Sequence, residues 1–166
     1  VVIGARYNDG GGSNAGHVRV YQYNGVSWNK MGQDIDGESS DDRFGFSVAI
    51  NKEGTIIAAG GYLDDGGTGG HSNHGHVRIY EWDEDNETWN QVGDDISGWK
   101  NHDEMGRGVS LSTDGYTIAI SHRASSSGGE KGRLTAHQWN GTTWNQLGDD
   151  TQMLYINDNN QGMTGN

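Results

Sequence analysis

The chain has 166 residues, among them 29 glycines, no proline and no cysteine, and its formal net charge is −12 at pH 7. The lack of cysteine excludes a disulfide framework, the acidic balance disfavours nucleic acid, whose phosphates attract Lys and Arg, and no stretch approaches the roughly 20 apolar residues of a membrane span. The 6 Trp and 7 Tyr supply apolar area for a core, since one aromatic side chain buries roughly 150–250 Å².

Short β-like runs start with the first residues. Val1–Ala5 is followed by a glycine-rich loop, by an alternating run at Gly16–Tyr23, and by a third run that begins at Trp28. Asn24-Gly25, between the last two runs, is a dipeptide typical of a type I′ hairpin turn. We therefore expect three strands of a partial unit in residues 1–36. Because the opening residues resemble the middle of a strand, we also expect a processed chain or a piece of a longer one.

A complete unit of four runs follows at residues 42–97. The runs are Phe44–Ile50, Thr55–Gly60, His76–Trp82 and Thr88–Ile96. Asn51–Gly54 joins the first two runs, with glycine at the position that needs a positive φ. The third run alternates between two sides, with Val77, Ile79 and Glu81 on one and Arg78, Tyr80 and Trp82 on the other. This pattern predicts four antiparallel strands.

The unit recurs in residues 103–151 in a weaker form. Gly16–Tyr23 returns as Gly75–Trp82 and again as Gly132–Trp139. Each copy is followed by a tryptophan at the same repeat position, and these are Trp28, Trp89 and Trp144.

The last residues, 152–166, depart from the repeat. They are a divergent tail or the start of another unit. Met153–Ile156 would supply either the strand that residues 1–36 lack or the first strand of that next unit.

Four antiparallel strands in roughly 60 residues form one blade of a β-propeller. A β-solenoid or a series of unrelated hairpins is the alternative, but solenoid coils are shorter and mostly parallel, whereas the turns here require antiparallel pairing. The sequence thus predicts an all-β chain of propeller blades, about three repeats of roughly 60 residues each. Because neighbouring blades bury each other's faces, we expect these blades to be part of a larger propeller or assembly.

Two short motifs recur within the units. One is Phe44-Gly45 with Ser47-Val48-Ala49, and the other is Ala58–Gly61, which matches Ile3-Gly4-Ala5. These motifs resemble the two elements of the FG-GAP repeat, the blade unit of integrin α-subunit propellers and of many surface proteins, with the proline of the second element missing. The resemblance extends over nearly the whole repeat region and weakens in the third copy, where Met105 replaces the Phe.

The resemblance implies a propeller of about seven blades on a surface or extracellular protein. Propellers of the integrin type bind calcium in a carboxylate-rich loop between the first two strands of a blade. Here the corresponding turns are Asn51–Gly54 and Ser112–Gly115, which are too short and too poor in carboxylates. The calcium site of that family is therefore not carried over.

The long loops of a propeller blade share one face, and in this chain that face is acidic. Its carboxylates are Asp9, Asp36, Glu38, Asp41, Asp42, Asp64, Asp65, Asp103 and Glu104. Function in repeat folds concentrates on such loops, but a solvated acidic rim that keeps the protein in solution is the competing interpretation. Trp99 stands in one of these loops without a counterpart and suits contact with a sugar or a protein. As ligand-binding residues we predict Asp9, Asp64, Asp65, Trp99, Asp103 and Glu104.

Metal binding is a further hypothesis for this face. Calcium prefers carboxylate and carbonyl oxygens, and a dense set of candidate ligands, without EF-hand spacing, is Asp36, Glu38, Asp41 and Asp42. Transition metals favour imidazole, and the chain clusters His71, His74 and His76. Because a single loop rarely supplies a complete site and the equivalent loops lack matching histidines, a solvated loop is favoured over a transition-metal site.

Two recurring sequence features have simpler explanations. The tryptophans at the shared repeat position are expected to pack between blades rather than to form a ligand cage. N-glycosylation sequons begin at Asn86 and Asn140, in turns expected to face solvent. Both asparagines are plausible acceptors if the protein is secreted by a eukaryote.

No catalytic constellation stands out, since the chain has no cysteine nucleophile, no GxSxG motif and no phosphate-binding loop. The sequence therefore favours a non-enzymatic adhesion, structural or recognition module, extracellular or on the cell surface, that contacts a protein or a glycan through the long-loop face. One alternative is a self-assembling component of an extracellular filament or complex, and another is a hydrolase or lyase on a propeller scaffold. Neighbouring blades or other copies of the chain are the expected partners, and calcium is the one cofactor considered.

Overall fold

The computed structural model is all-β and describes residues 1–65, 72–123, 132–148 and 154–156. Within these ranges every regular element is a strand, and no helix is long and apolar enough to cross a membrane. The strands are β1 (Val2–Ala5), β2 (His17–Tyr23), β3 (Trp28–Asp36), β4 (Ser47–Ile50), β5 (Ile56–Gly61), β6 (His76–Asp83), β7 (Thr88–Gln91), β8 (Ile96–Ser97), β9 (Gly108–Leu111), β10 (Thr117–His122), β11 (Gly132–Trp139), β12 (Trp144–Leu147) and β13 (Leu154–Ile156).

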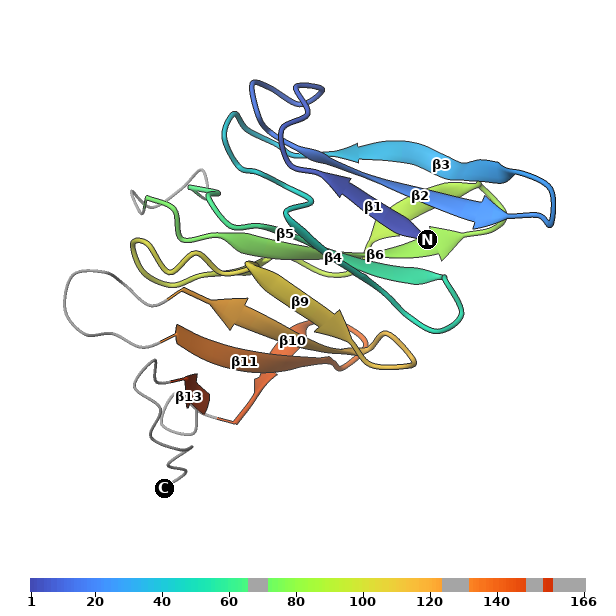
Figure 1. Cartoon of the computed structure of the whole chain (residues 1–166). Coiled ribbons are helices and arrows are strands. Elements are labelled where there is room, and N and C mark those ends of the chain that lie inside the picture. Colours follow the sequence, from blue (N-terminus) through green and yellow to red (C-terminus); the bar gives the residue numbers. More distant parts are fainter. Residues whose placement is uncertain (66–71, 124–131, 149–153, 157–166) are drawn as a thin grey trace.

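These strands form three antiparallel sheets in chain order. The first sheet is β1-β2-β3, the second is β4-β5-β6-β7 with β8 on β6, and the third is β9-β10-β11-β12 with β13 on β11. Figure 1 shows the sheets stacked one on another, with β1, β4 and β9 along the near side of the stack. The runs expected in residues 42–97 are therefore strands of one sheet, and the third sheet repeats their order.

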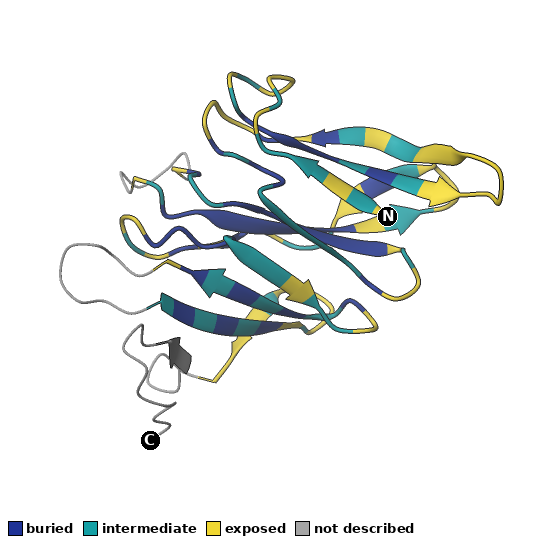
Figure 2. Ribbon diagram, in the orientation of Figure 1, coloured by how far each residue is buried: buried dark blue, intermediate teal, exposed yellow. Residues whose placement is uncertain are grey.

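The second sheet lies in the middle of the stack and is covered on both faces. Ile57 pairs with Tyr80 on the face turned to the first sheet, and Ala58 pairs with Ile79 on the face turned to the third. Burial of one such aliphatic side chain contributes roughly 1.5–3 kcal/mol. Figure 2 shows buried residues running along β5 and β6 accordingly. The alternation predicted for the third run of this unit is confirmed, and both of its faces are core.

Glycines let adjacent sheets approach each other at backbone distance. A Cβ on Gly4 of β1 would lie 1.9 Å from the carbonyl oxygen of Gly45, and a Cβ on Gly60 of β5 would lie 2.2 Å from that of Gly106. Gly45 and Gly106 adopt φ values of 78° and 88°, which side chains with a Cβ rarely tolerate. The two short motifs found in the sequence are thus the two halves of one contact, formed between the first and second sheets and again between the second and third.

Asn51 closes the turn between β4 and β5. Its Oδ1 accepts hydrogen bonds from the backbone N–H groups of Thr55 and Ile56 at 2.9 and 3.0 Å. Gly54 adopts a φ of 79°, as the hairpin prediction required.

The connection between β2 and β3 differs from its prediction. A type I′ turn needs positive φ at both central residues, but of Asn24 and Gly25 only the glycine has it. The Oδ1 atom of Asn24 accepts hydrogen bonds from the backbone N–H groups of Val26 and Ser27, both at 2.9 Å. The type I′ prediction is wrong because these side-chain bonds stabilise a longer loop over residues 24–27.

β13 belongs to the third sheet. Its Leu154 pairs with Leu134 of β11, in the way that Ile96 of β8 pairs with Val77 of β6 in the second sheet. Residues 154–156 therefore extend the third sheet instead of pairing with β1 of the first.

Two of the three recurring tryptophans bind the neighbouring sheet. Trp89 Nε1 donates a hydrogen bond to the carbonyl oxygen of Met31 at 3.1 Å, and Trp144 Nε1 donates to that of Val92 at 2.8 Å. The prediction of packing between sheets is confirmed for both residues. Trp28 is 56% exposed.

Candidate functional site

The long connections of all three sheets meet at one end of the stack, here termed the loop end, on the left of Figure 1. The short turns lie at the opposite end, the turn end. Parts of two long connections, residues 66–71 and 124–131, lie outside the described residues. Every ligand-binding residue predicted from the sequence belongs to the loop end.

Four acidic side chains of the loop end are buried and so are not part of a solvated rim. Asp103 is 0% exposed, and Asp42, Asp64 and Glu104 are 3%, 8% and 2% exposed. A buried carboxylate costs free energy unless it is paired and hydrogen-bonded. Histidine and arginine side chains at the loop end surround these carboxylates.

Asp103 is held by residues of two strands of the third sheet. Arg133 Nη2 donates to Asp103 Oδ2 at 2.5 Å, and His122 Nδ1 lies 3.1 Å from the same oxygen. The other ring nitrogen of His122 lies 2.9 Å from Thr135 Oγ1. Because all four residues are buried, this cluster attaches the loop before β9 to β10 and β11. A ligand contact at Asp103 stays a prediction.

Trp99 lies beside this cluster and is 59% exposed. Arg133 Cζ and Lys100 Nζ lie 4.9 and 5.3 Å from the centre of its ring. Such cation–π contacts contribute about 0.5–2 kcal/mol each, so the ring is held in place by charges of its own chain. A ligand contact at Trp99 stays a prediction.

A second buried cluster surrounds Asp64. His76 Nδ1 and His74 Nε2 lie 3.3 and 3.7 Å from Asp64 Oδ1. Burial raises the pKa of Asp42 to about 6, and the charge of Asp64 acts in the same direction. Of the histidine cluster noted in the sequence, His74 and His76 thus face a carboxylate, and His71 lies outside the described residues.

The two exposed aspartates predicted as ligand-binding residues form local loop contacts. Asp9 Oδ1 accepts a hydrogen bond from the backbone N–H of Asn14 at 2.7 Å, and Asp65 Oδ1 accepts one from Asn73 at 2.6 Å. Each bond lies within a single connection between two strands. Their ligand contacts stay predictions.

The remaining candidate metal ligands each face a different basic side chain. Asp36 lies 3.6 Å from His17, Glu38 lies 3.1 Å from Arg78, and Asp41 lies 3.2 Å from Arg43. In the part of the chain that the structure describes, no three His, Asp or Glu side chains form a group that could hold a metal ion. Calcium binding at Asp36, Glu38, Asp41 and Asp42 stays a prediction.

The two sequon asparagines lie in exposed turns at the turn end. Asn86 Nδ2 donates to Asp83 Oδ2 at 2.8 Å, and Asn140 Oδ1 accepts from the backbone of Thr142 and Thr143 at 2.8 and 2.9 Å. Both amides therefore stabilise their own turns. Glycosylation at either residue stays a prediction.

A continuous row of cationic and aromatic side chains crosses the loop end, and no sequence motif had singled it out. This arginine–aromatic row consists of Arg43, Tyr7, Arg6, Phe46, Tyr62, Arg107, Glu104 and Arg123. Arg6 Cζ lies 4.6 Å from the ring centre of Tyr7 and 5.0 Å from that of Phe46. The row continues to Tyr62, whose ring centre is 4.4 Å from that of Phe46, and to Arg107, whose Cζ is 4.6 Å from the Tyr62 ring.

Equivalent repeat positions supply most of the row. Arg6, Tyr62 and Arg123 directly follow β1, β5 and β10. Phe46 and Arg107 directly precede β4 and β9. The sequence signal was therefore present, as arginine or an aromatic residue at the same two strand ends in each unit, but it becomes visible only once the strand ends are known.

Glu104 lies between the last two arginines of the row. Arg107 Nε donates to Glu104 Oε2 at 2.6 Å, and Arg123 Nη1 donates to Oε1 at 2.5 Å. Because both carboxylate oxygens are engaged and the side chain is buried, Glu104 aligns the two guanidinium groups.

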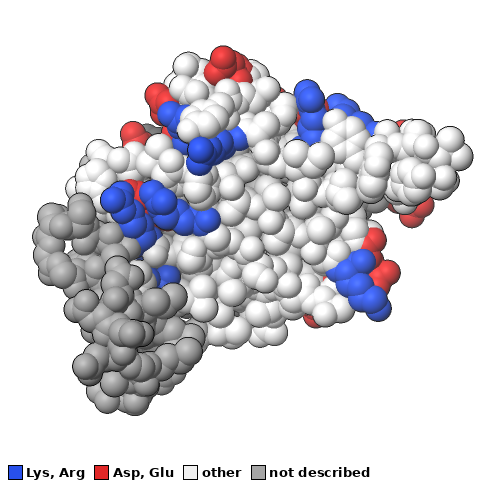
Figure 3. All heavy atoms as spheres, in the orientation of Figure 1, with Lys and Arg blue, Asp and Glu red and all other residues white. Residues whose placement is uncertain are grey.

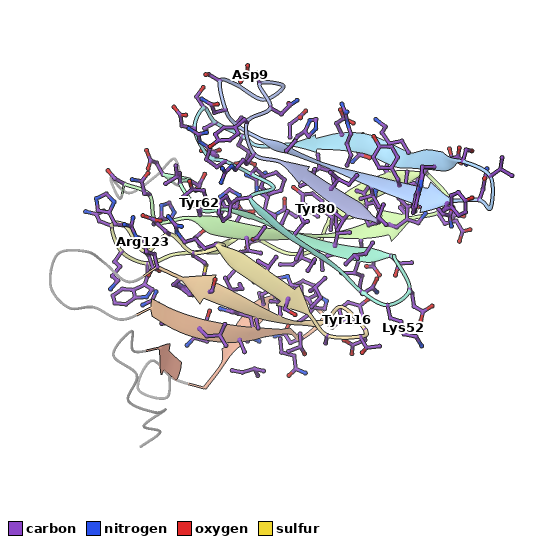
Figure 4. The ribbon with its side chains drawn as sticks, viewed as in Figure 1. Asp9, Lys52, Tyr62, Tyr80, Tyr116 and Arg123 are labelled. Atoms are coloured by element: carbon purple, nitrogen blue, oxygen red, sulfur yellow. The ribbon has the colours of Figure 1, made fainter. Side chains whose placement is uncertain are left out.

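The row is the cationic part of an acidic protein. Its four arginines belong to a total of 11 Lys and Arg in a chain of net charge −12. Within the described residues the Arg6 guanidinium has cation–π contacts and no carboxylate partner. Figure 3 shows Lys and Arg side chains over the loop end of the face that carries β1, β4 and β9, and others toward the turn end. Figure 4 places Tyr62 and Arg123 at this end, and Lys52 and Tyr116 at the turn end.

A groove of about 810 Å³ lies at the turn end and is lined by residues of the first and second sheets. Its walls include Tyr23, Trp28, Lys30, Lys52 and Trp82. The groove combines aromatic faces with charges of both signs, and it lies at the opposite end of the stack from the arginine–aromatic row.

Comparison with known proteins bears on the fold. No family model and no curated protein matches the chain. Among solved structures 49 chains match, including the periplasmic gluconolactonase of Pseudomonas aeruginosa, a propeller enzyme, with a TM-score of 0.51 and 14% identity over 89% of this chain. This chain spans 37% of the length of that enzyme. At this identity the likeness shows the fold alone.

The comparison corrects the functional prediction. The predicted non-enzymatic adhesion module is wrong: adhesion finds no support, and one of the solved structures that share this fold is a hydrolase. The physical reason lies at the loop end. Four of the nine carboxylates on which the prediction depended are buried, and the row that crosses the same end carries arginines and aromatic rings. The chain thus shares the architecture of stacked antiparallel sheets with a propeller hydrolase.

Proposed function

We propose that this chain carries part of the substrate site of a β-propeller hydrolase that opens lactones or esters of small acids, with the arginine–aromatic row as that site. The observation that carries the proposal is Arg6, whose Cζ lies 4.6 and 5.0 Å from the ring centres of Tyr7 and Phe46 and which has no carboxylate partner among the described residues. A cation–π contact does not pair the five N–H donors of a guanidinium group with oxygen acceptors, so donors are left for an anionic ligand.

The chemistry of lactone or ester hydrolysis matches such donors. The reaction passes through a tetrahedral oxyanion and ends in a carboxylate. Arginine binds carboxylates through paired N–H···O bonds, and one donor aimed at an oxyanion typically contributes about 10²–10³-fold in rate. The rings of Tyr7, Phe46 and Tyr62 would pack against the apolar face of a sugar-like substrate.

Glu104 acts as a positioning residue in this proposal. Both of its oxygens accept hydrogen bonds from Arg107 and Arg123, so we assign it no role as the general base. It holds the two guanidinium groups at the end of the row. The general base that activates water is a different group.

The larger architecture belongs to the same proposal. We infer that the three sheets are blades of a propeller with further blades, which is supported by a likeness that spans 37% of a propeller enzyme. The interpretation as an FG-GAP-like repeat is supported by the contact of Gly4 with Gly45, which joins both motifs. A location outside the cytoplasm is supported by the periplasmic name of the matching enzyme.

The test separates binding from turnover. Gluconate would be titrated into the ¹⁵N-labelled chain, and the NMR signals of Arg6, Tyr7 and Tyr62 are expected to shift. Hydrolysis of glucono-δ-lactone would be followed by acid release at constant pH. We expect Arg6→Gln to weaken gluconate binding at least about tenfold and to lower turnover about 10²-fold.

Lys52→Gln is the matched control, because it removes one exposed cation at the turn end. It should leave both measurements unchanged. If gluconate shifts no signal in the row, or binds Arg6→Gln as well as the parent, the row is not the site. If gluconate binds but lactone disappears no faster than in buffer, the hydrolase proposal is wrong and the row is an anion-binding surface.

A further inference from the structure

One aromatic pair recurs at the same register position in all three sheets. The two residues of each pair lie opposite each other on adjacent strands at the turn end, and the pairs are Tyr23–Trp28, Trp82–Trp89 and Trp139–Trp144. Their ring centres are 5.1, 5.3 and 5.5 Å apart, respectively. The near-identical spacing shows that the repeat preserves this pair as a unit.

Two of the pairs pack onto a glycine of the preceding sheet. A Cβ on Gly32 would lie 2.9 and 3.1 Å from the rings of the Trp82–Trp89 pair. A Cβ on Gly93 would lie 2.6 and 3.3 Å from the rings of the Trp139–Trp144 pair. Both glycines adopt positive φ, 67° and 73°, so both the space and the backbone select glycine.

The carbonyl group just before each glycine completes the joint. Met31 precedes Gly32 and accepts the indole N–H of Trp89, and Val92 precedes Gly93 and accepts that of Trp144. The same three parts therefore join the first sheet to the second and the second to the third: an aromatic pair, a glycine with positive φ, and the preceding carbonyl oxygen.

Among the described residues, each outer sheet carries one half of this joint without its counterpart. Tyr23 and Trp28 are 52% and 56% exposed, and the alternation along β2 places Tyr23 on the face opposite to Val20, which packs against the second sheet. In the third sheet Gly148 follows Leu147, stands at the repeat position of Gly32, and adopts a φ of 80°. The aromatic half and the glycine half lie on opposite outer faces of the stack.

Exposed apolar side chains lie near both halves. On the first sheet Val1 and Ile3 are 53% and 52% exposed. Ile3 pairs with Arg19 in the way that Ala59 pairs with Arg78 in the second sheet, so Ile3 and Ala59 occupy equivalent positions. Ala59 is 0% exposed because the first sheet covers it. On the third sheet Leu147 is 47% exposed. A further sheet packed on each of these faces would bury them, as the contacts among the three sheets bury the equivalent side chains inside the stack.

We propose that the occupant is a second copy of this chain, with the Tyr23–Trp28 pair of one copy packed on Gly148 of the other. The indole N–H of Trp28 then donates to the carbonyl oxygen of Leu147. The contact is heterologous, because the two copies contribute different faces to it. The assembly closes when each copy offers its aromatic half to the other and receives the other's aromatic half on its glycine half.

The mass of the complex in solution tests the proposal. Sedimentation equilibrium at about 100 µM should give about 36 kDa, twice the 18.0 kDa of the chain. Trp28→Ala should raise the dissociation constant of the dimer at least about tenfold and keep the fold, because the side chain is exposed. Gly148→Val should do the same from the other face. Trp99→Ala, which removes another exposed tryptophan, is the control and should leave the dimer intact.

The pairing of faces is tested by cross-linking, since the chain has no cysteine. A Val26→Cys chain, changed two residues before Trp28, would be mixed with a Leu147→Cys chain and treated with a short bis-maleimide. We expect a covalent dimer in the mixture and none in either chain alone. A monomer at about 100 µM, a dimer insensitive to Trp28→Ala, or either cysteine chain linking to itself would each overturn the proposal.

Discussion

His137 of β11 shows what burial does to a single titratable group in this protein. It is 7% exposed and lies opposite Ile118, which packs against the second sheet. Its Nε2 lies 3.2 Å from Thr135 Oγ1. Burial lowers the pKa of His137 to about 4, and the nearby His122 acts in the same direction, because a charged imidazole is disfavoured away from water and beside a second cation.

His137→Gln should flatten the acid side of the stability profile. Histidine in an unfolded chain titrates near pH 6.5, so the neutral folded form contributes stability that is fully present above pH 6.5 and is lost as the pH falls through 4. The loss amounts to about 3 kcal/mol. Urea unfolding measured between pH 7 and 4 should show this loss in the parent and not in the variant.

His102→Gln is the control for this prediction, because His102 is an exposed loop residue. The free energy of unfolding of His102→Gln should depend on pH in the same way as that of the parent. Asp42 changes the stability in the opposite direction, because its folded pKa is raised to about 6. The stability that Asp42 contributes is present below its unfolded pKa and is lost as the pH rises through 6. Asp42 is common to all three proteins, so equal profiles for the parent and His137→Gln would contradict the prediction.

At the level of elements, the contact between Gly60 and Gly106 sets how closely the second and third sheets approach. Gly60→Ala should destabilise the fold by about 1–3 kcal/mol, because the new Cβ would lie 2.2 Å from the Gly106 carbonyl oxygen. Ser47 Oγ donates to the same oxygen at 2.6 Å, so the neighbouring strand has little freedom to move away. Urea unfolding gives the free energy, and NMR should show shifts in both sheets.

Gly25→Ala is the contrasting variant. Gly25 has nothing within 4 Å of a built Cβ and a φ of 96°, so its cost of about 1–2 kcal/mol comes from backbone conformation alone. Its NMR shifts should stay within the β2–β3 connection. Shifts for Gly60→Ala that were equally local would show that the two sheets do not meet at this glycine.

The sequence predicted which elements exist better than where they end. The run expected to begin at Phe44 becomes a strand only at Ser47, because Gly45 takes a φ of 78° to meet the first sheet. The run over Thr88–Ile96 divides into β7 and β8 around Gly93, which turns to receive an aromatic pair. In both cases a contact with another sheet, absent from any local pattern, interrupts the strand.

At the level of the whole molecule, the stack is held by joints between neighbouring sheets. Trp89→Ala should lower the free energy of unfolding by about 3–5 kcal/mol, since the residue is 3% exposed and bonds the first sheet through Met31. Because each sheet contacts only its neighbours, hydrogen exchange should accelerate most in the first sheet. Urea unfolding and amide exchange would measure the two effects.

Trp99→Ala serves here as the control, since that side chain is 59% exposed. Its cost should stay within about 1 kcal/mol. Similar losses for Trp89→Ala and Trp99→Ala, or uniform acceleration of exchange in all sheets, would show that the joint does not couple the first sheet to the rest.

The candidate site was harder to predict than the fold. Sequence patterns placed Asp103 and Glu104 correctly in a loop at the loop end but could not show that both are buried. Burial of a loop side chain depends on strands that lie far along the chain, such as the one that carries Arg133. The arginine–aromatic row was missed for the same reason, because Arg6, Phe46 and Arg107 are far apart in sequence and adjacent only across sheets.

The sequence by itself determined the repeat, the antiparallel runs, their alternation and the inward tryptophans, because these depend on periodicity and on turn residues within a few positions of each other. Only the tertiary structure decided which carboxylates are internal, which arginines are accessible, and which glycines receive a neighbour's rings. Those properties arise where one sheet packs on the next, and packing brings together residues whose separation along the chain carries no local signal.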